Sequence, residues 1–514
     1  MIRTNQLPTM IFGRRWLYGI LAVICIIIYA NSLGGAFVSD DIPGIVKNPG
    51  LSRPGDFILN PPVFLASLNY ISAKFNPLSY HLTNLFLHIL NSILAFIFLG
   101  LFFKTEPAFL GACLFAAHPV HAEAVSWISG RPYLTLGLFI FAAYLFYHRA
   151  VRDDRKVSIK FYVLSLVTFS YYLVDSYSFY AMFVFFLVLC DLTLERCRRT
   201  WRLWLPFFFI LLARLVLAKS AIGARLHFVT KEMGLNHAEW TNPINNMAYS
   251  LFSHFSLLVV PAKLSLYHEP AVISSLILKI LLCILLLLLI ISPFIYKRAR
   301  RIFLAMGIFV LFLVPTYSPF PFSWLVAERY VYFSAISLCM ILAFLYEKYA
   351  QKCPNRIHYA LVVFLLIVAA YAARTVARNE DWQSPGRLWR QTVAVSDLSP
   401  RAHNNMGDAY GQEGNTDGAI REFKRAIALK PDYADAYHNL ANTYEGQGSS
   451  EEAIKYYLQA VNFNPGLFES QYNLGVIYLN KGQNIEAIKY LTRAKELRPD
   501  DAGVNAALNI AYKR

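Results

Sequence analysis

Two adjacent carboxylates are the first residues of the chain whose types could do chemistry. Asp40 and Asp41 lie in the segment FVSDDIPGIVKNPG, shortly after a long apolar stretch. A carboxylate held at a partly dry boundary can act as a general base that takes a proton from an acceptor hydroxyl. The neighbouring carboxylate could orient that base or hold a divalent cation. A helix N-cap or a solvated pair of loop residues is the alternative without chemistry.

A second polar cluster lies in the segment HPVHAEAVSWISGR, residues 118–131. Its polar members are His118, His121, Glu123 and Arg131. Histidine and glutamate are zinc ligand types, but Pro119 interrupts the helix between the two histidines and no second metal motif supports them. We therefore expect the histidines to bind a polar ligand or to fix the loop, and we expect no metal at this cluster.

Two further segments carry charged residues beside apolar runs. The segment LVAERYVY contains Glu328 and Arg329, and the segment RTVARNEDW contains Arg374 and Arg378. Charged side chains at membrane depth are costly and mark functional sites. An arginine can hold a phosphate through two parallel hydrogen bonds, so these segments predict a site for a lipid phosphate or an anionic head group. Ordinary anchoring at the membrane surface is the alternative.

The composition places these residues in a membrane protein. The chain has 514 residues, of which 56% are apolar and 16% charged, and its mean hydropathy is +0.41. Soluble proteins carry about 25% charged residues, so disorder and a single soluble domain are excluded. We expect an all-α fold in which residues 1–379 form a polytopic domain of about eleven spans of roughly 20 residues each. The expected spans are 15–33, 82–103, 107–127, 131–149, 158–175, 177–194, 202–219, 271–295, 302–318, 329–347 and 357–376.

Basic loops predict the orientation of these spans, because basic residues accumulate on the cytoplasmic side. The pair Arg14-Arg15 places the N-terminus inside. Further basic loops are found at 148–156, 195–202, 296–301 and 347–356. All four are cytoplasmic if the segment 243–262 does not cross, so we interpret that segment as an interfacial or re-entrant helix. The charged clusters, the outer loop 34–81 and the C-terminal residues then share the extracytoplasmic side.

Residues 380–514 repeat with a period of 34 and form the second expected domain. The recurring residues are Pro431, Pro465 and Pro499; Tyr410, Tyr444 and Tyr478; Ala419, Ala453 and Ala487; and Ala426, Ala460 and Ala494. This pattern is typical of tetratricopeptide (TPR) repeats, which contain two helices each and stack into an α-solenoid. We expect about 3.5 repeats, with a half repeat at 384–397 docked on the membrane domain and a capping helix at 501–514.

Three asparagines, Asn405, Asn439 and Asn473, recur with the same period. Each lies on the first helix of a repeat, whose face lines the concave groove of such a solenoid. An asparagine ladder can hydrogen-bond the backbone of an extended peptide without reading its sequence. The ladder therefore predicts a groove for an acceptor peptide, and ordinary solvated asparagines are the alternative.

Charge and cysteine content exclude two other classes of protein. Residues 1–379 hold 33 basic and 15 acidic side chains, whereas residues 380–514 hold 15 and 17. The net charge of +16 thus arises in the membrane half, much of it in cytoplasmic loops, and we expect no nucleic-acid partner. The seven cysteines form no CxxC pair, so neither a disulfide framework nor a zinc site is expected.

Taken together, these motifs resemble the transmembrane and tetratricopeptide-repeat-containing O-mannosyltransferases and their bacterial relatives, in the glycosyltransferase-C superfamily. The matching segments are FVSDDIPGIVKNP, HPVHAEAVSWISGR, AERYVYFSAISLC, RTVARNEDW and the TPR repeats. The resemblance implies a glycosyltransferase-C membrane domain, a polyprenyl-phosphate monosaccharide as donor and transfer with inversion. By position it implies that Asp40-Asp41 holds the catalytic base, with Asp40 slightly favoured.

The resemblance also implies roles for the other clusters. His118, His121, Glu123 and His268 would line the same cavity, and Glu328 and Arg329 would lie near the donor phosphate. The sequence departs from the family at three places: Asp175 lies in LVDSYS where a Ser-Lys-Glu stretch is usual, Tyr133 replaces an acid, and His268 replaces another. These departures leave the sugar open, so mannose is not assumed.

We therefore predict an integral multi-pass enzyme, expected in a bacterial inner membrane with its TPR domain in the periplasm. It would transfer a monosaccharide from a polyprenyl-phosphate donor to a hydroxyl, expected to be a Ser or Thr of a protein presented by the TPR groove. The expected donor-binding residues are Arg131, Glu328, Arg329, Arg374 and Arg378. The lipid-linked sugar is a co-substrate, and a divalent cation is the one cofactor left open. A non-enzymatic membrane-anchored TPR scaffold, or the same transferase acting on an envelope glycan or lipid, is the alternative.

Overall fold

The computed structural model describes residues 15–153, 156–172, 177–217, 243–268, 300–317 and 325–513, and the single residues Ile277, Ile280 and Ile284. Every regular element in these residues is helical, which confirms the all-α expectation. The chain divides into two compact units, Met1–Ser384 and Pro385–Arg514. Their boundary lies close to the change in composition near residue 380.

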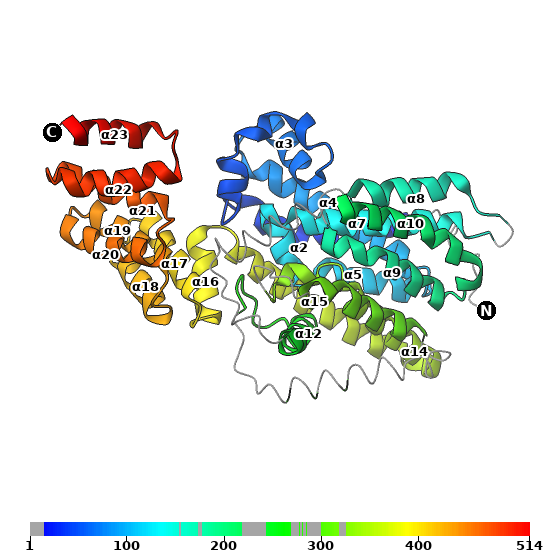
Figure 1. The fold of residues 1–514 in the computed structure, drawn as a ribbon. Helices are drawn as coiled ribbons and strands as arrows, with labels where there is room; N and C mark the ends of the chain where they lie inside the picture. The colour runs from blue at the N-terminus through cyan, green and yellow to red at the C-terminus, as the bar shows by residue number, and fades with distance from the viewer. Residues whose placement is uncertain are drawn as a thin grey trace. The chain divides into compact units, whose positions relative to one another are not determined.

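The first unit is a bundle of mostly apolar helices (Figure 1). Its α-helices are α2 (Trp16–Tyr29), α3 (Pro61–Ala73), α4 (Pro77–Leu99), α5 (Thr105–Ala117), α6 (His121–Ser126), α7 (Arg131–Ala150), α8 (Ile159–Tyr172), α9 (Tyr177–Thr193), α10 (Cys197–Leu217), α12 (Pro243–Val259), α14 (Ile336–Lys352) and α15 (Ile357–Asp381). Residues 300–313 are also helical. Short helical turns are η2 (Ala30–Gly34), η3 (Ile42–Val46), η4 (Pro49–Ser52), η5 (Pro54–Phe57), η6 (Ile128–Gly130), η9 (Val314–Tyr317), η10 (Glu328–Val331) and η11 (Pro354–Arg356).

Five segments of this unit are long and apolar enough to cross a membrane. They are Trp16–Gly34, Pro77–Leu99, Ile128–Ala150, Cys197–Leu217 and Pro354–Asp381. Each coincides with an expected span, and together they support a membrane protein. Shorter apolar helices cover further expected spans, so the figure of eleven stays a prediction. The expected span 271–295, apart from three single residues, and Asp175 lie outside the described residues.

The expected span 107–127 is not one helix, because α5 ends at Ala117. The next residue, His118, is extended (φ −70°, ψ 126°), as expected for a residue that precedes proline. The 13 residues of α5 rise about 20 Å, which is less than the roughly 30 Å of a bilayer core. Similarly, the expected span 329–347 begins as the short turn η10, and α14 starts only at Ile336. Both breaks bring polar residues into the protein interior.

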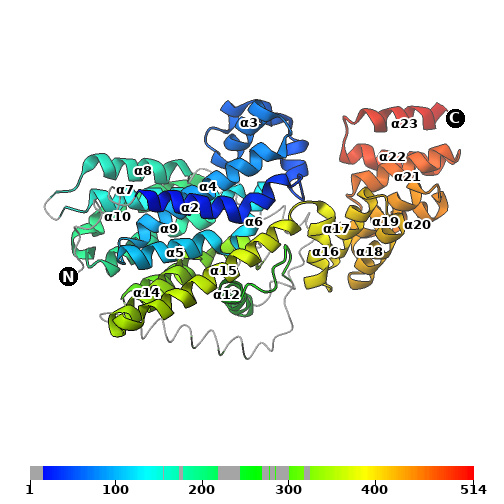
Figure 2. The ribbon, with the colours of Figure 1, turned by 180° about the vertical axis from the view of Figure 1, so that it is seen from behind.

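The core of the bundle forms around α2, α4 and α5. Helix α2 contacts α4, α5 and α15, and α4 contacts α7 as well. In Figure 2, α2 runs in front of the bundle with α15 and α5 beside it. Thr375 on α15 donates to the carbonyl of Ala117 at 2.7 Å, which fixes the end of α5 against α15. In the outer loop, α3 begins at Pro61-Pro62, and the Asn60 side chain caps it by accepting from the Val63 N–H.

Helix α12 confirms the expected helix in the segment 243–262. The last carbonyls of α12 have no hydrogen-bond donor within the helix. Side chains from elsewhere in the unit donate to them or to the carbonyls that follow. His118 Nε2 lies 3.0 Å from the Leu258 oxygen, and the Tyr371 hydroxyl donates to the same oxygen at 3.0 Å. Arg374 donates to Pro261 and Ala262 oxygens at 3.3 Å. Protein groups thus satisfy the carbonyls at the end of α12, as they must for a helix that ends inside a membrane domain. That α12 does not cross the membrane stays a prediction.

The second unit is a stack of antiparallel helix pairs (Figure 1). Its helices are α16 (Pro385–Val395), α17 (Pro400–Gln412), α18 (Thr416–Leu429), α19 (Ala434–Gly446), α20 (Ser450–Phe463), α21 (Phe468–Asn480), α22 (Asn484–Leu497) and α23 (Ala502–Lys513). The pairs α17–α18, α19–α20 and α21–α22 follow the predicted 34-residue period. Helix α16 packs on α17 and α23 packs on α22, which matches the expected half repeat and capping helix.

Glycines at two points of the repeat explain the tight pairing. Gly414, Gly448 and Gly482 turn the chain between paired helices with φ of +76°, +77° and +71°, a region that favours glycine. Gly407 lies where α17 meets α18, and a Cβ atom there would come within 2.5 Å of the Phe423 ring. Because the interior is close-packed, the ring would have to move.

A matched pair of glycines in α17 tests this packing. We expect Gly407→Ala to destabilise the first repeat by about 1–3 kcal/mol through overpacking. A Cβ atom added at Gly411 would meet no neighbouring element within 4 Å, so Gly411→Ala should be neutral or stabilising by up to about 1 kcal/mol. Amide hydrogen exchange over residues 400–430 of the full chain measures both. Equal protection in the two variants would contradict the packing account.

Candidate functional site

The four charged segments predicted from the sequence meet in the first unit. The meeting point is the stretch from Glu123 to Arg131, which runs from within α6 through η6 to the first residue of α7 and is named here the central turn. Ser129 contacts the acidic pair, Glu123 contacts η10, and Ser126 donates to Asn379 on α15 at 2.9 Å. Segments that lie up to 253 residues apart in sequence are therefore joined by direct polar contacts.

The structure separates the two members of the acidic pair. Asp41 is fully buried, and its hydrogen-bond partners belong to the outer loop and the central turn. One carboxylate oxygen accepts from the Ser129 N–H at 2.8 Å and the Ser129 hydroxyl at 2.5 Å, and the other accepts from the Val38 N–H at 3.0 Å. Asp40 is exposed, and within the described residues its carboxylate accepts no hydrogen bond. Asp41 is thus built into the loop, whereas Asp40 is available to a ligand.

The surroundings raise the pKa of both carboxyl groups. Burial raises the pKa of Asp41 to about 6, while the hydrogen bonds from Ser129 and Val38 oppose the shift. Loss of surrounding water also raises the pKa of Asp40, and the positive charge of Arg329 opposes it. A raised pKa makes a carboxylate a stronger proton acceptor. The effect of Arg329 also indicates that this cation and Asp40 share one electrostatic environment.

A buried ion pair links the central turn to η10. Glu123 is fully buried, and its carboxylate forms an ion pair with the Arg329 guanidinium. The same carboxylate accepts from the Arg329 backbone N–H at 2.7 Å. The guanidinium also lies over two rings, 5.5 Å from the Trp127 centroid and 5.1 Å from the Tyr330 centroid. Arg329 is therefore rigidly placed by one carboxylate and two aromatic side chains.

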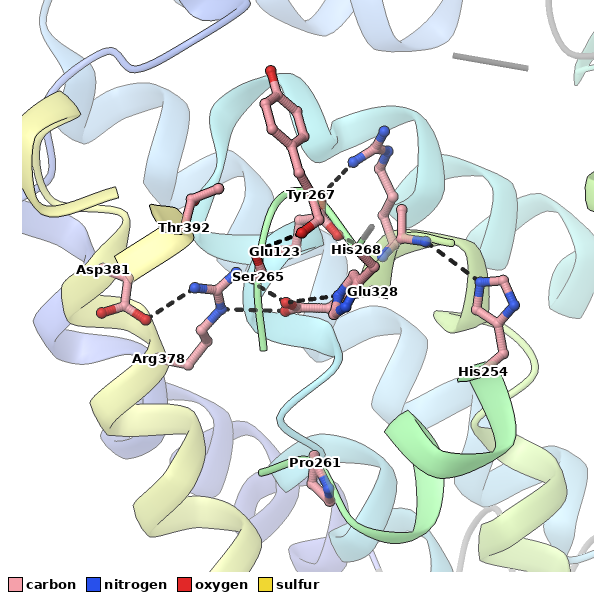
Figure 3. Close-up of polar contacts among 12 residues, drawn as sticks. Glu123, His254, Pro261, Ser265, Tyr267, His268, Glu328, Arg378, Asp381 and Thr392 are labelled. Carbon is pink, nitrogen blue, oxygen red and sulfur yellow. Dashed lines mark hydrogen bonds and ion pairs between the residues drawn. The ribbon is translucent and has the colours of Figure 1, made fainter. Parts of the chain in front are cut away.

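The neighbouring residue forms a second buried pair, drawn in Figure 3. Arg378 reaches Glu328 with Nη2 at 2.9 Å and Nε at 3.3 Å, and its Nη1 lies 2.9 Å from Asp381. His268 also lies beside Glu328, with Nε2 at 3.9 Å from a carboxylate oxygen. Because both carboxylates point at Arg378, its charge is already compensated. The two adjacent residues of η10 thus form ion pairs with different helices, Arg329 with α6 and Glu328 with α15.

Arg131 differs from these arginines. It is 3% exposed, and its hydrogen bonds go to uncharged groups. Its Nε donates to Asn84 Oδ1 at 2.9 Å and its Nη2 to the Tyr80 carbonyl at 3.3 Å. The third nitrogen, Nη1, is buried without a partner among the described residues.

Three residues predicted to line the site or bind the donor contact the protein backbone. Both ring nitrogens of His118 are engaged by backbone, at Leu258 and Val120. Those of His121 lie 2.8 Å and 3.0 Å from the carbonyls of Phe115 and Tyr332. Arg374 holds the end of α12. These contacts favour the interpretation in which the histidines fix the loop. In the part of the chain that the structure describes, no cluster of three His, Cys, Asp or Glu side chains could hold a metal ion.

Several residues of the site could not be recognised from the sequence. Ser129, Asn84 and Asn379 are uncharged, and no spacing rule marks them. Gly130 is required because a Cβ atom there would come within 2.7 Å of the Ala124 carbonyl oxygen. Ser129 and Gly130 lie in the segment 118–131, which the sequence marks as a candidate site through its charged residues and histidines. The part that these two residues play depends on contacts with distant residues, which the sequence does not reveal.

In the second unit, the three repeated asparagines are half-buried on first helices. Asn439 donates to Asn404 Oδ1 at 3.1 Å, and Asn473 donates to Asn442 Oδ1 at 3.2 Å and to the Tyr457 hydroxyl at 2.9 Å. Two of the asparagines therefore link neighbouring repeats. Asn405 lies at the equivalent position of α17. Peptide binding by this ladder stays a prediction.

Comparison with known proteins bears out the resemblance drawn from the motifs. Residues 407–448 match the family described as TPR repeat, and residues 434–466 and 468–501 match Tetratricopeptide repeat. The chain is 27% identical to a protein O-mannosyl-transferase of Caenorhabditis elegans, over 80% of this chain and 63% of that protein. It is 25% identical to Protein O-mannosyl-transferase TMTC3 of Mus musculus, over 79% and 50%, and 25% identical to TMTC4 of Homo sapiens, over 81% and 67%. The chain thus spans about half to two thirds of the length of these relatives.

The buried pair Glu123–Arg329 makes a testable prediction about stability. Removing one partner of a buried pair leaves an uncompensated charge, so Glu123→Ala should lower the free energy of unfolding by about 3–5 kcal/mol. Glu469→Ala breaks an exposed pair with Arg498, whose atoms lie 2.6 Å apart, and should cost at most about 1 kcal/mol. Thermal unfolding of both variants in detergent measures the difference. Similar losses would mean that the pair does not hold the site together.

Proposed function

We propose that the chain is a membrane glycosyltransferase that moves a monosaccharide from a polyprenyl-phosphate donor to a hydroxyl group, in the first instance a Ser or Thr of a protein. The naming of its relatives as protein O-mannosyl-transferases supports the reaction class. The observation that carries the proposal is the contrast between exposed Asp40 and buried Asp41, with the positive charge of Arg329 acting on Asp40.

The proposed reaction needs one base and one stabilised leaving group. The acceptor oxygen attacks the anomeric carbon, its proton passes to Asp40, and the bond from that carbon to the phosphate oxygen breaks. Polyprenyl phosphate leaves with the bonding electron pair, and attack from the opposite face inverts the anomeric centre. Arg329 acts electrostatically on Asp40, and although its guanidinium is paired with Glu123, its positive charge stabilises through space the negative charge that develops on the phosphate.

The two carboxylates of the pair take different parts in this proposal. Asp41 accepts three hydrogen bonds and holds the loop, so it orients Asp40 and does not itself meet the acceptor. Arg378 is compensated by Glu328 and Asp381, so it stabilises η10 and thereby the position of Arg329. The TPR unit binds the acceptor protein, and we place it with the acidic pair on the extracytoplasmic side, as the basic loops predict.

Transfer in a reconstituted system tests the base. With the full chain in lipid nanodiscs, a set of polyprenyl-phosphate monosaccharides including mannose, and a Ser/Thr-rich acceptor protein, Asp40→Asn should lower transfer by at least about 100-fold. Thermal stability should be unchanged, because the side chain is exposed. Asp56→Asn removes another exposed carboxyl of the same outer loop and should keep full activity.

The outcomes discriminate among the functions under consideration. Full activity of Asp40→Asn would overturn its assignment as the base. Transfer to a glycan or lipid acceptor but not to protein would replace the proposed acceptor while keeping the chemistry. No transfer by the wild type with any donor or acceptor would favour the membrane-anchored TPR scaffold.

A further inference from the structure

The central turn carries one buried cation whose role the proposed reaction does not explain. Arg131 is 3% exposed and has no carboxylate within 4 Å in the described part of the chain. Asp41 is 0% exposed and has no cationic nitrogen within the same distance there. The Arg131 guanidinium lies over the Tyr80 ring, 5.8 Å from its centroid, and interacts electrostatically with Asp41 across the turn. Buried charges are costly, so the way in which this turn holds two opposite ones without a direct ion pair requires an explanation.

The contacts between these two charges form a continuous series. Arg131 Nε donates to Asn84 Oδ1 at 2.9 Å, and Asn84 is itself fully buried. The amide nitrogen of Asn84 faces three carbonyl oxygens of the central turn, at 3.3 Å from Val125, 3.0 Å from Trp127 and 3.4 Å from Ile128. The next residue, Ser129, donates twice to Asp41. Hydrogen bonds therefore connect Arg131 to Asn84 and Asn84 to the backbone of the central turn, and the same turn carries Ser129, which binds Asp41.

The geometry also argues against direct binding of the donor by Arg131. Its remaining nitrogen, Nη1, is buried and offers almost no accessible surface to a phosphate. Nε and Nη2 are already used by Asn84 and by the Tyr80 carbonyl. The contacts of Arg131 therefore favour a role inside the protein over the predicted contact with the donor phosphate.

We infer that Arg131 is a positioning residue for the acidic pair, acting through Asn84 and the central turn to fix Asp41 and, through it, the direction of Asp40. The guanidinium aligns the Asn84 amide so that its nitrogen, and not its oxygen, meets the three carbonyls. This orientation sets the place of Ser129, which then holds Asp41. The inference about Asp40 rests on the proposed function, whereas the series from Arg131 to Asp41 does not.

Arg131→Lys tests the series because it keeps a positive charge but removes the two-nitrogen contact to Asn84 and Tyr80. Amide hydrogen exchange of the full chain in nanodiscs should rise about tenfold at Val38 and Ser129. In the transfer assay kcat should fall about tenfold or more, since small displacements of a reacting group are costly, while KM for the donor stays within twofold. Arg301→Lys is the matched control, because Arg301 likewise donates to one backbone carbonyl, that of Phe102, and to one side-chain oxygen, of Glu347, and neither partner lies in the central turn.

A second variant covers the case in which Arg131→Lys does not fold. Ser129→Ala removes one of the hydrogen bonds to Asp41 and should raise exchange at Val38 and lower kcat about threefold to tenfold, again without a change in donor KM. Unchanged exchange in the variants that fold would overturn the inference, whatever the activity. A large rise in the KM for the donor with unchanged exchange would mean that Arg131 binds the donor directly. Altered exchange in a protein without any transferase activity would support the series and reject the proposed function alone.

Discussion

The buried ion pair between Glu123 and Arg329 is the interaction on which the rest of the site depends. Taking two charges out of water is costly unless geometry and further hydrogen bonds compensate for the lost hydration. Here the carboxylate also accepts from the Arg329 backbone, so the short turn η10 is tied to α6 by main chain and side chain together. A fixed η10 then presents Glu328 to Arg378, and a fixed α6 leads directly into the turn that holds Asp41.

This arrangement explains why most charges of the site are not free to bind a ligand. Glu123, Glu328 and Arg378 are fully buried and compensate one another or a neighbour. Asp41 is satisfied by three donors from the loop and the central turn. What remains for a ligand is the exposed carboxylate of Asp40 in the field of Arg329. The proposed chemistry therefore rests on one exposed group whose position is determined by many buried ones.

The repeats and the apolar helices could be predicted from the sequence because each depends on local pattern. A 34-residue period identifies paired helices wherever it occurs, and apolar runs identify long helices such as α4 and α15. The break at His118 has a local signal in Pro119, yet the apolar residues on both sides of it favour an unbroken span. Charged residues mark the segments of the site. Their individual roles could not be predicted, since Arg131 and Arg329 differ only in which distant side chains they meet, and Asn84 and Ser129 carry no charge to mark them.

A structure of the full chain with a non-transferable donor analogue, a polyprenyl phosphonate carrying the monosaccharide, is the most direct test of the proposed site. We expect the anomeric carbon to lie within about 4 Å of the Asp40 carboxylate or one bridging water from it, with the phosphonate oxygens facing Arg329. The contacts of Asp41 to Ser129 and Val38 should persist in that complex. Donor density at a different part of the membrane unit, or against Asp41 with Asp40 turned away, would contradict the assignment of Asp40 as the base.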